Sequence, residues 1–275
     1  WINLCNLRCC FVEFLEFTNN IHAKLCFVVR REKGKLERYT HIGSGNYNAA
    51  SAKIYTDLGL FTANKDINDD VQDLFNVMTG YGVVNHYRKL LVSPHTLRPG
   101  ITKLIRREID QHKKHGNGHI IIKCNQLVDY EMVKVLYEAS RAGVKIECIV
   151  RGICSLRPGL PGVSDTITVR SIVGRLLEHA RIYYFHNNGD EEMYFGSADL
   201  MTRNLNGRIE VLTPLLQENL RNNVMNQIVI PQLKDNIHAW VMNSDGSYTK
   251  LQPKKDETVY DSQEEIAKKL NLMKK

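Results

Sequence analysis

The chain has 275 residues, 43% of them hydrophobic and 24% charged, which is enough for one large or two ordinary domains with a substantial core. Its formal net charge of +7 at pH 7 favours anionic partners such as nucleic acid, phospholipid headgroups, nucleotides or another phosphate polymer. No apolar run approaches the roughly 20 residues that a membrane-spanning helix needs, and we see no secretory signal. Cys26, Cys124 and Cys148 lie in apolar runs, which suits the reduced thiols of a cytoplasmic protein.

The first third of the chain is predicted to form a hairpin, a turn of small residues and a helix. Residues 1–20 cannot be assigned. The apolar runs 23–29 and 36–42 read as strands, a short helix is expected over 48–55, and a strand over 56–60. The strongest signal is the apolar spacing i, i+3, i+4, i+7, which predicts a helix over residues 66–79 and is set by Val71, Leu74, Phe75 and Met78.

Two prolines, Pro94 and Pro99, indicate a domain boundary near residue 90. A strand–helix–strand unit is the clearest pattern beyond it, and its two strands should be parallel. The expected elements after residue 90 are a helix over 101–109, a strand over 119–125, a helix over 130–142, strands over 144–150, 166–171, 181–186, 191–197 and 208–213, and a helix over 216–230. Ser262 and Glu265 form a capping-box pattern for a last helix, with Ile266 and Leu270 facing inward.

Polar residues follow the two strands of the strand–helix–strand unit. Ligands of open α/β sheets bind beyond the carboxyl ends of the strands. Lys123, Asn125 and Arg151 are therefore candidates to face a ligand, although each alone also reads as an ordinary surface residue.

A histidine followed two places later by a base occurs twice, at His22 with Lys24 and at His179 with Arg181. The first leads on to Gly43-Ser44-Gly45-Asn46 and the second to Gly196-Ser197-Ala198-Asp199. In an extended segment, residues i and i+2 point to the same face, so each histidine should project with its base. An imidazole beside a fixed cation suits phosphoryl transfer, because the ring attacks or moves protons while the cation balances phosphoryl charge. A single such histidine is usually an ordinary core or surface residue, but a repeated unit favours a chemical site.

The chain resembles the C-terminal catalytic half of bacterial polyphosphate kinase over about residues 21–230. The matching stretches are Ile21-His22-Ala23-Lys24, His41-Ile42-Gly43-Ser44-Gly45-Asn46-Tyr47-Asn48, Tyr55-Thr56-Asp57, Asn125-Gln126-Leu127-Val128-Asp129, Ile149-Val150-Arg151-Gly152-Ile153-Cys154-Ser155-Leu156-Arg157-Pro158, Arg170-Ser171-Ile172-Val173-Gly174-Arg175, Glu178-His179-Ala180-Arg181, Gly196-Ser197-Ala198-Asp199 and Met201-Thr202-Arg203-Asn204. The resemblance implies an α/β fold of two phospholipase D-like domains, with mixed β-sheets flanked by helices. Residues 1–90 would be the first catalytic domain, truncated at its N-terminus, and residues 91–275 the second, with a C-terminal helix.

The resemblance also implies an activity and roles for residues. The chain would transfer the γ-phosphate of ATP reversibly to inorganic polyphosphate, through a phosphohistidine at His22. His179 would act as general acid or base, and Tyr55, Arg151 and His179 would contact nucleotide and phosphate. An anionic channel would be lined by Lys24, Arg181, Lys123, Asn125, Arg203 and Arg208. Mg²⁺ would be a cofactor whose ligands lie outside this chain.

The implied partners are ATP, ADP and inorganic polyphosphate, in a cytoplasmic homo-oligomer that is compatible with peripheral membrane association. Nucleic acid is not expected, because aromatic residues do not alternate with the basic ones as in a stacking platform. One alternative is a phospholipase D-type phosphodiesterase or nuclease. Its site would read His-x-Lys-x4-Asp, and Val29 and His186 at the acidic positions disfavour it. Another is an inactive fragment that binds polyphosphate without transferring phosphate.

Overall fold

The computed structural model describes residues 20–80, 82 and 86–270. In chain order its elements are β1 (Asn20–Ile21), β2 (Lys24–Glu32), β3 (Lys35–Gly43), the 3-10 helix η1 (Ser51–Lys53), β4 (Tyr55–Thr56), β5 (Gly59–Thr62), α1 (Lys65–Met78), β6 (Leu91–Val92), α2 (Leu97–His115), β7 (His119–Cys124), α3 (Tyr130–Arg141), β8 (Lys145–Val150), β9 (Ile167–Ile172), β10 (Leu177–Glu178), β11 (Arg181–Phe185), η2 (Asn187–Gly189), β12 (Glu192–Gly196), α4 (Thr202–Asn206), β13 (Arg208–Ile209), β14 (Val211–Pro214), α5 (Glu218–Val224), the π-helical segment η3 (Met225–Val229), α6 (Ile230–Lys234), β15 (Ala239–Met242), β16 (Tyr248–Lys250) and α7 (Ser262–Lys269). Among these described residues, no helix is long and apolar enough to cross a membrane.

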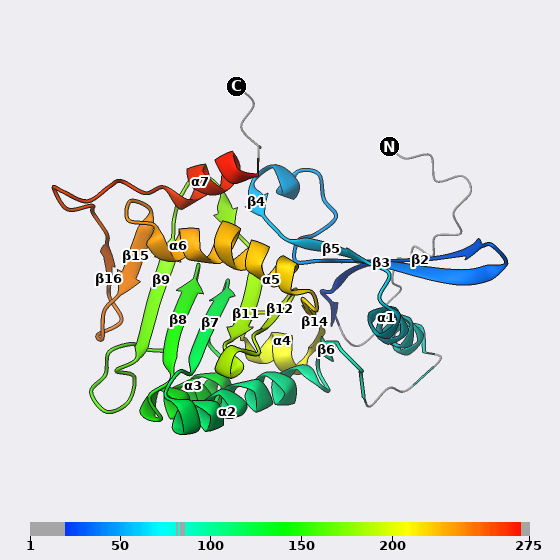
Figure 1. Ribbon diagram of the computed structural model, residues 1–275, viewed down its shortest axis with the longest axis horizontal. Helices are drawn as coiled ribbons and strands as arrows, with labels where there is room; N and C mark the ends of the chain where they lie inside the picture. Colours follow the sequence, from blue (N-terminus) through cyan, green and yellow to red (C-terminus); the bar gives the residue numbers. More distant parts are fainter. Residues whose placement is uncertain (1–19, 81, 83–85, 271–275) are drawn as a thin grey trace.

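A nine-stranded mixed sheet forms the larger layer, in the order β16-β15-β9-β8-β7-β11-β12-β14-β6 (Figure 1). Its centre, β7-β8-β9, is parallel, which the strand–helix–strand pattern predicts for β7 and β8. Both faces are covered, so successive residues of β7 are buried on opposite sides. Ile120 and Ile122 pack with α2 and α3, whereas Ile121 belongs to the core beneath the α5–α6 segment.

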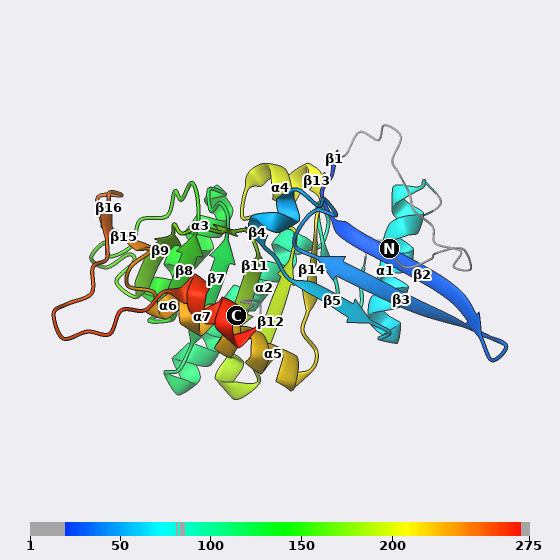
Figure 2. The ribbon, with the colours of Figure 1, turned by 90° about the horizontal axis from the view of Figure 1, so that it is seen from above.

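A smaller three-stranded sheet, β2-β3-β5, carries the long hairpin at the start of the described chain. Helix α1 packs on it through Ile67, Val71 and Leu74, and begins where the Asn64 side chain accepts a hydrogen bond from the Ile67 N–H. Figures 1 and 2 show the hairpin extending away from the nine-stranded sheet. The predicted hairpin and helix are therefore confirmed.

Two short parallel bridges join the halves of the chain. β1 pairs with β13, and β4 pairs with β10. Beyond the first bridge, the N–H groups of His22 and Ala23 both donate to the Ile209 carbonyl oxygen. Beyond the second, the N–H groups of His179 and Ala180 donate to the Thr56 carbonyl oxygen. Each histidine unit is thus held in place by a strand from the other half.

Several predicted elements differ from those observed. The helix expected over 48–55 is only the 3-10 turn η1, and the strand expected over 208–213 divides into β13 and β14 with Glu210 between them. The helix expected over 216–230 begins at Glu218, contains a π-helical segment and continues to Lys234. The break at Glu210 comes where the chain passes from the pairing of β13 with β1 to the pairing of β14 with β12 and β6.

The capping box predicted at Ser262 for the last helix is wrong. Asp261 caps α7, with its carboxylate accepting from the N–H groups of Gln263 and Glu264, while the Ser262 hydroxyl donates to Asp235. Leu270 is 42% exposed rather than inward, and the buried positions of α7 are Ser262, Gln263 and Ala267. The boundary near residue 90 and the division into two domains remain predictions.

Candidate active site

His22 follows β1 directly and meets an acid from the far end of the chain. Its Nδ1 lies 2.9 Å from Oε2 of Glu210, which comes immediately after β13, the strand that pairs with β1. The Glu210 side chain is completely buried, and its other oxygen accepts a hydrogen bond from the Asn204 amide. Within the described part of the chain, Nε2 of His22 has no hydrogen-bond partner. The acid therefore fixes one ring nitrogen and leaves the other open.

His179 has surroundings that match those of His22. It follows β10, and its Nδ1 lies 2.8 Å from Oδ1 of Asp57, the residue after β4. Tyr55 packs its ring against the imidazole at a centroid distance of 4.7 Å. Here Nε2 is occupied, because Nη1 of Arg181 lies 3.0 Å away. Burial lowers the pKa of His179 and Arg181 lowers it further, against the opposing hydrogen bond and charge of Asp57, so the ring is neutral at pH 7.

The two serine turns complete this duplication. The Ser44 hydroxyl donates to Asp57 at 2.6 Å and accepts from the Leu58 N–H at 2.9 Å. In the other half, the Ser197 hydroxyl accepts from the N–H of Val211, the residue after Glu210, at 3.1 Å. Each serine thus holds the backbone that follows an acid. The repeated sequence unit is a repeated site, and each half supplies the carboxylate for the other half's histidine.

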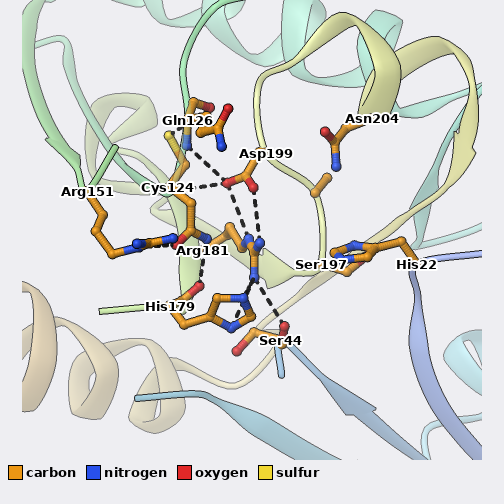
Figure 3. A network of polar contacts seen from close by, with 12 residues as sticks. His22, Ser44, Cys124, Gln126, Arg151, His179, Arg181, Ser197, Asp199 and Asn204 are labelled. Carbon is orange, nitrogen blue, oxygen red and sulfur yellow. Dashed lines mark hydrogen bonds and ion pairs between the residues drawn. The ribbon is translucent and has the colours of Figure 1, made fainter. Parts of the chain in front are cut away.

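Lys24 and Arg181 lie between the two histidines. Lys24 is 5% exposed, and its ammonium donates to the His22 carbonyl oxygen. Burial lowers the pKa of Lys24 to about 8, with Arg181 and Arg208 lowering it and Glu210 and Asp57 raising it. Arg181 donates to both oxygens of Asp199, at 3.3 and 3.0 Å, and to the Ser44 carbonyl oxygen at 3.3 Å. Figure 3 shows Arg181 at the centre, with His179 and His22 at the same site.

Asn125 and Arg151, at the carboxyl ends of β7 and β8, also reach this site. Nε of Arg151 donates to Oδ1 of Asn125 at 2.7 Å, and the Asn125 amide donates to the His179 carbonyl oxygen at 3.0 Å. Asp199 fixes Asn125 by accepting from its backbone N–H at 2.7 Å. The structure thus brings Asn125 and Arg151 beside His179, and their contacts with a ligand stay a prediction.

The remaining predicted basic residues lie differently. The Lys123 side chain is 2% exposed, and its ammonium pairs with Glu178 at 3.2 Å. A contact of Lys123 with an anionic ligand stays a prediction. Arg208 lies close enough to Lys24 to affect its pKa. Arg203 is exposed on α4, and the structure shows no contact between it and the histidines.

Two acids of the site were not predicted from the sequence. Glu210 was read only as part of a strand, and Asp57 only as part of a matching stretch. The repeat itself carries the signal, since Ser44 precedes Asp57 by the same number of residues as Ser197 precedes Glu210.

The described residues show no ready-made cluster of metal ligands. They contain no group of three or more histidine, cysteine or acidic residues placed to hold a metal ion. Asp57, Asp199 and Glu210 each already accept hydrogen bonds from histidine, arginine or backbone groups. These acids are therefore already engaged within the protein.

Comparison with known proteins agrees with this geometry. The family model described as polyphosphate kinase C-terminal domain 1 matches residues 5–84, and that of polyphosphate kinase C-terminal domain 2 matches residues 90–263. The chain belongs to the polyphosphate kinase family. The match to the first domain begins at residue 5, which corrects the expected start near residue 21 and brings part of the unassigned segment into the family; residues 1–19 lie outside the described structure.

The polyphosphate kinase relatives are much longer than this chain. Polyphosphate kinase from Prosthecochloris aestuarii is 54% identical over 84% of this chain and 32% of its own length. That from Bacillus cereus is 49% identical over 82% of this chain and 32% of its own. The chain therefore spans about a third of the curated relatives it matches.

Solved structures support the same family and the mixed α/β fold. The crystal structure of polyphosphate kinase from Porphyromonas gingivalis matches 92% of this chain and 39% of that one, at 38% identity and a TM-score of 0.86. The phospholipase D family member Nuc from Salmonella typhimurium matches half of this chain at 12% identity and a TM-score of 0.38.

Proposed function

We propose that this site transfers the γ-phosphoryl group of ATP reversibly to inorganic polyphosphate, with His22 as the group that carries it. The observation that supports this most directly is the asymmetry of the His22 ring. Glu210 holds Nδ1, so the proton lies there and the lone pair lies on the open Nε2. The open nitrogen is the one that can attack phosphorus.

The proposed reaction has two displacements. Nε2 of His22 forms a bond to the γ-phosphorus as the bond from that phosphorus to the β–γ bridging oxygen breaks, and ADP leaves. A terminal oxygen of polyphosphate then attacks the same phosphorus, and Nε2 leaves. Transfers of this kind depend mainly on positioning and on balancing oxygen charge, which suits Lys24 and Arg181 between the rings.

His179 is proposed to serve the oxygen that enters or leaves. Its lowered pKa keeps the ring neutral at pH 7, so it can accept a proton, and Asp57 stabilises the imidazolium that results. Tyr55 packs on this ring, Asn125 donates to the His179 carbonyl oxygen and Arg151 donates to Asn125. All three are proposed to orient the nucleotide and its phosphates. Arg203 and Arg208 would add positive charge along the path of the polymer.

Other properties of the parent protein are proposed from the family alone. These are Mg²⁺ as a cofactor, homo-oligomerisation, a cytoplasmic location and compatibility with peripheral membrane association. ATP, ADP and polyphosphate are the proposed substrates, and nucleic acid is not a proposed partner.

The proposal is tested by incubating the chain with γ-labelled ATP. We expect acid-labile, base-stable label on the wild-type chain and none on His22→Gln. His119→Gln is the matched control, because His119 lies at the opposite end of β7 and pairs with Glu147. Loss of label in His119→Gln as well as His22→Gln, or label retained in His22→Gln, would contradict the assignment.

The same preparation separates the two alternatives. Hydrolysis of a phosphodiester without any nucleotide would favour a phospholipase D-type enzyme. Salt-sensitive binding of polyphosphate with no label would favour an inactive polyphosphate-binding fragment.

A further inference from the structure

Glu178, the residue directly before His179, has a buried carboxylate that the reaction does not use. The residue is 3% exposed, and four side chains donate to its carboxylate. Oε2 accepts from Lys123 at 3.2 Å, Gln232 at 2.5 Å and Thr56 at 3.0 Å, and Oε1 accepts from Gln263 at 2.9 Å. The donors come from β7, α6, β4 and α7, so four separate elements converge on one residue of β10.

Gln263 of α7 does more than donate to this carboxylate. Its side-chain oxygen accepts from the Leu176 N–H at 2.9 Å, and its amide nitrogen donates to the Leu176 carbonyl oxygen at 2.8 Å. The side chain thus pairs with the backbone before β10 as a neighbouring strand would. Gly174 leaves it room, since a Cβ there would lie 2.6 Å from the Gln263 oxygen.

This arrangement exists in only one half of the duplicated site. The residue before the first histidine is Ile21, which packs against the apolar core beneath the small sheet. A buried carboxylate is costly unless it is paired and fully hydrogen-bonded, so its presence next to one histidine calls for a reason. β10 contains only two residues, and its strand pairing is with the equally short β4. Such a short segment needs side-chain anchors to hold a fixed position.

We propose that Glu178 is a positioning residue for His179, and that α7 acts through Gln263 to fix where this imidazole stands. The contacts run from Gln263 to Glu178, from Glu178 to Thr56, and from the Thr56 carbonyl back to the N–H of His179. The C-terminal helix is then part of the second half-site. The placement of His179 follows from these contacts alone, whereas its effect on phosphoryl transfer rests on the proposed function.

The test compares Gln263→Leu with Glu264→Gln, which changes an exposed side chain of the same helix. The readout is the titration of the His179 ring by nuclear magnetic resonance of the histidine-labelled chain, without nucleotide. The groups that face the ring are Asp57, Arg181, Lys24 and Tyr55, and neither variant changes them. Loosening β10 admits water and relieves burial, so the pKa of His179 rises toward its ordinary value in Gln263→Leu and stays unchanged in Glu264→Gln. An unchanged His179 titration in folded Gln263→Leu would overturn the proposal.

A second variant covers the case in which Gln263→Leu does not fold. Glu178→Gln combined with Lys123→Met removes both buried charges together, so no unpaired charge remains. The same rise in the His179 pKa is expected, with the titration of His119 unchanged. If both histidines keep their wild-type titrations, Glu178 has no positioning role.

The rate of phosphoryl transfer to polyphosphate gives a separate test of this positioning role. If the chain labels His22, transfer to polyphosphate should fall about tenfold or more in Gln263→Leu with little change in the KM for ATP, because misplacing a catalytic group lowers kcat. A chain that transfers nothing would remove the proposed function, yet the His179 titration would still decide whether Glu178 positions the ring.

Discussion

The two histidines have similar surroundings, but they differ in the acid that pairs with Nδ1 and in the contacts of Nε2. Glu210 is wholly buried and its second oxygen is bound by Asn204, whereas the Asp57 side chain is 24% exposed. Nε2 of His22 is open within the described structure, and Nε2 of His179 faces Arg181. These differences are the basis for proposing unequal roles for the duplicated rings, with His22 as the nucleophile and His179 as the acid or base.

Replacing Glu210 by glutamine should change the tautomer of His22 that leaves Nε2 free to attack. An amide nitrogen facing Nδ1 donates instead of accepting, so the ring proton moves to Nε2 and the attacking lone pair is lost. Because the wrong tautomer of a catalytic histidine can cost about 10⁴-fold, we expect at least a hundredfold slower labelling of His22. Rapid-quench labelling measures this. Asn206→Asp, at an exposed position at the end of α4, serves as a control of unchanged rate.

If Lys24 binds phosphate as proposed, anion binding should depend on pH. Its pKa is lowered to about 8, so its charge is present below that pH and is lost as the pH rises through about 8. Binding of tripolyphosphate, measured by calorimetry between pH 6.5 and 9.5, should therefore weaken on the alkaline side. Lys24→Arg keeps its charge throughout, so its affinity should stay level over that range. An equal alkaline loss in both proteins would contradict this role for Lys24.

At the scale of elements, the bridges β1–β13 and β4–β10 position the residues of the site. Each is only two residues long, and each brings a histidine to an acid from the other half. The turn after β3 leaves little space beside Asp57. A Cβ on Gly45 would lie 2.0 Å from Oδ2 of Asp57, while one on Gly43 would meet its neighbours at 3.5 Å or more.

Gly45→Ala should therefore push the Asp57 carboxylate away from His179, whereas Gly43→Ala should not. Because the displaced group is the end of a side chain, Gly45→Ala should lower the free energy of unfolding by only about 1–3 kcal/mol. Transfer to polyphosphate should fall in Gly45→Ala and remain near wild type in Gly43→Ala. Denaturant unfolding and a transfer assay on both variants check the two parts, and equal activities would contradict the argument.

Asp129 links the helix after β7 to two other elements. Its carboxylate caps α3 through the Met132 N–H, accepts from Thr202 at 2.9 Å and pairs with Arg98 at 2.5 and 2.8 Å. Burial would raise its pKa, but the hydrogen bonds from Arg98, Thr202 and Met132 hold the pKa below the usual value. Because the folded-state pKa is lowered, this contribution to stability is present above the unfolded pKa near 3.9 and is lost as the pH falls through the lower folded value.

Asp129→Ala should lower the free energy of unfolding by about 2–4 kcal/mol at pH 7, through loss of the cap and of the partner of Arg98. Asp129→Asn keeps an acceptor for the cap and should lose less. Urea unfolding at pH 7 and pH 3 gives the comparison, and the difference between wild type and Asp129→Ala should shrink at the lower pH. A difference that is the same at both pH values would exclude the charge as its source.

Local pattern predicted the elements that pack their own apolar faces. The spacing of Val71, Leu74 and Met78 gave α1, and the runs at 119–125 and 144–150 gave the parallel pair β7–β8. Local pattern could not predict Glu210 or Asp57 as partners of the histidines, because each pairing joins residues more than 100 positions apart. The pairing of Lys123 with Glu178 could not be predicted for the same reason, because Glu178 lies on a distant strand.

At the scale of the whole molecule, the site belongs to neither half alone. The first half supplies His22, Lys24, Ser44 and Asp57, and the second supplies His179, Arg181, Ser197 and Glu210. Changing the relative placement of the halves would separate both histidine–acid pairs together. The family models meet between residues 84 and 90, so this shared site lies across the junction of the two family domains.

The most direct test of the account is to map the phosphorylated atom after reaction with ATP. Peptide mass spectrometry locates the residue, and phosphorus nuclear magnetic resonance distinguishes the two ring nitrogens. We expect one phosphoryl group per chain, on Nε2 of His22, that polyphosphate removes. Phosphate on Nδ1 of His22, or on His179 in place of His22, would contradict the account.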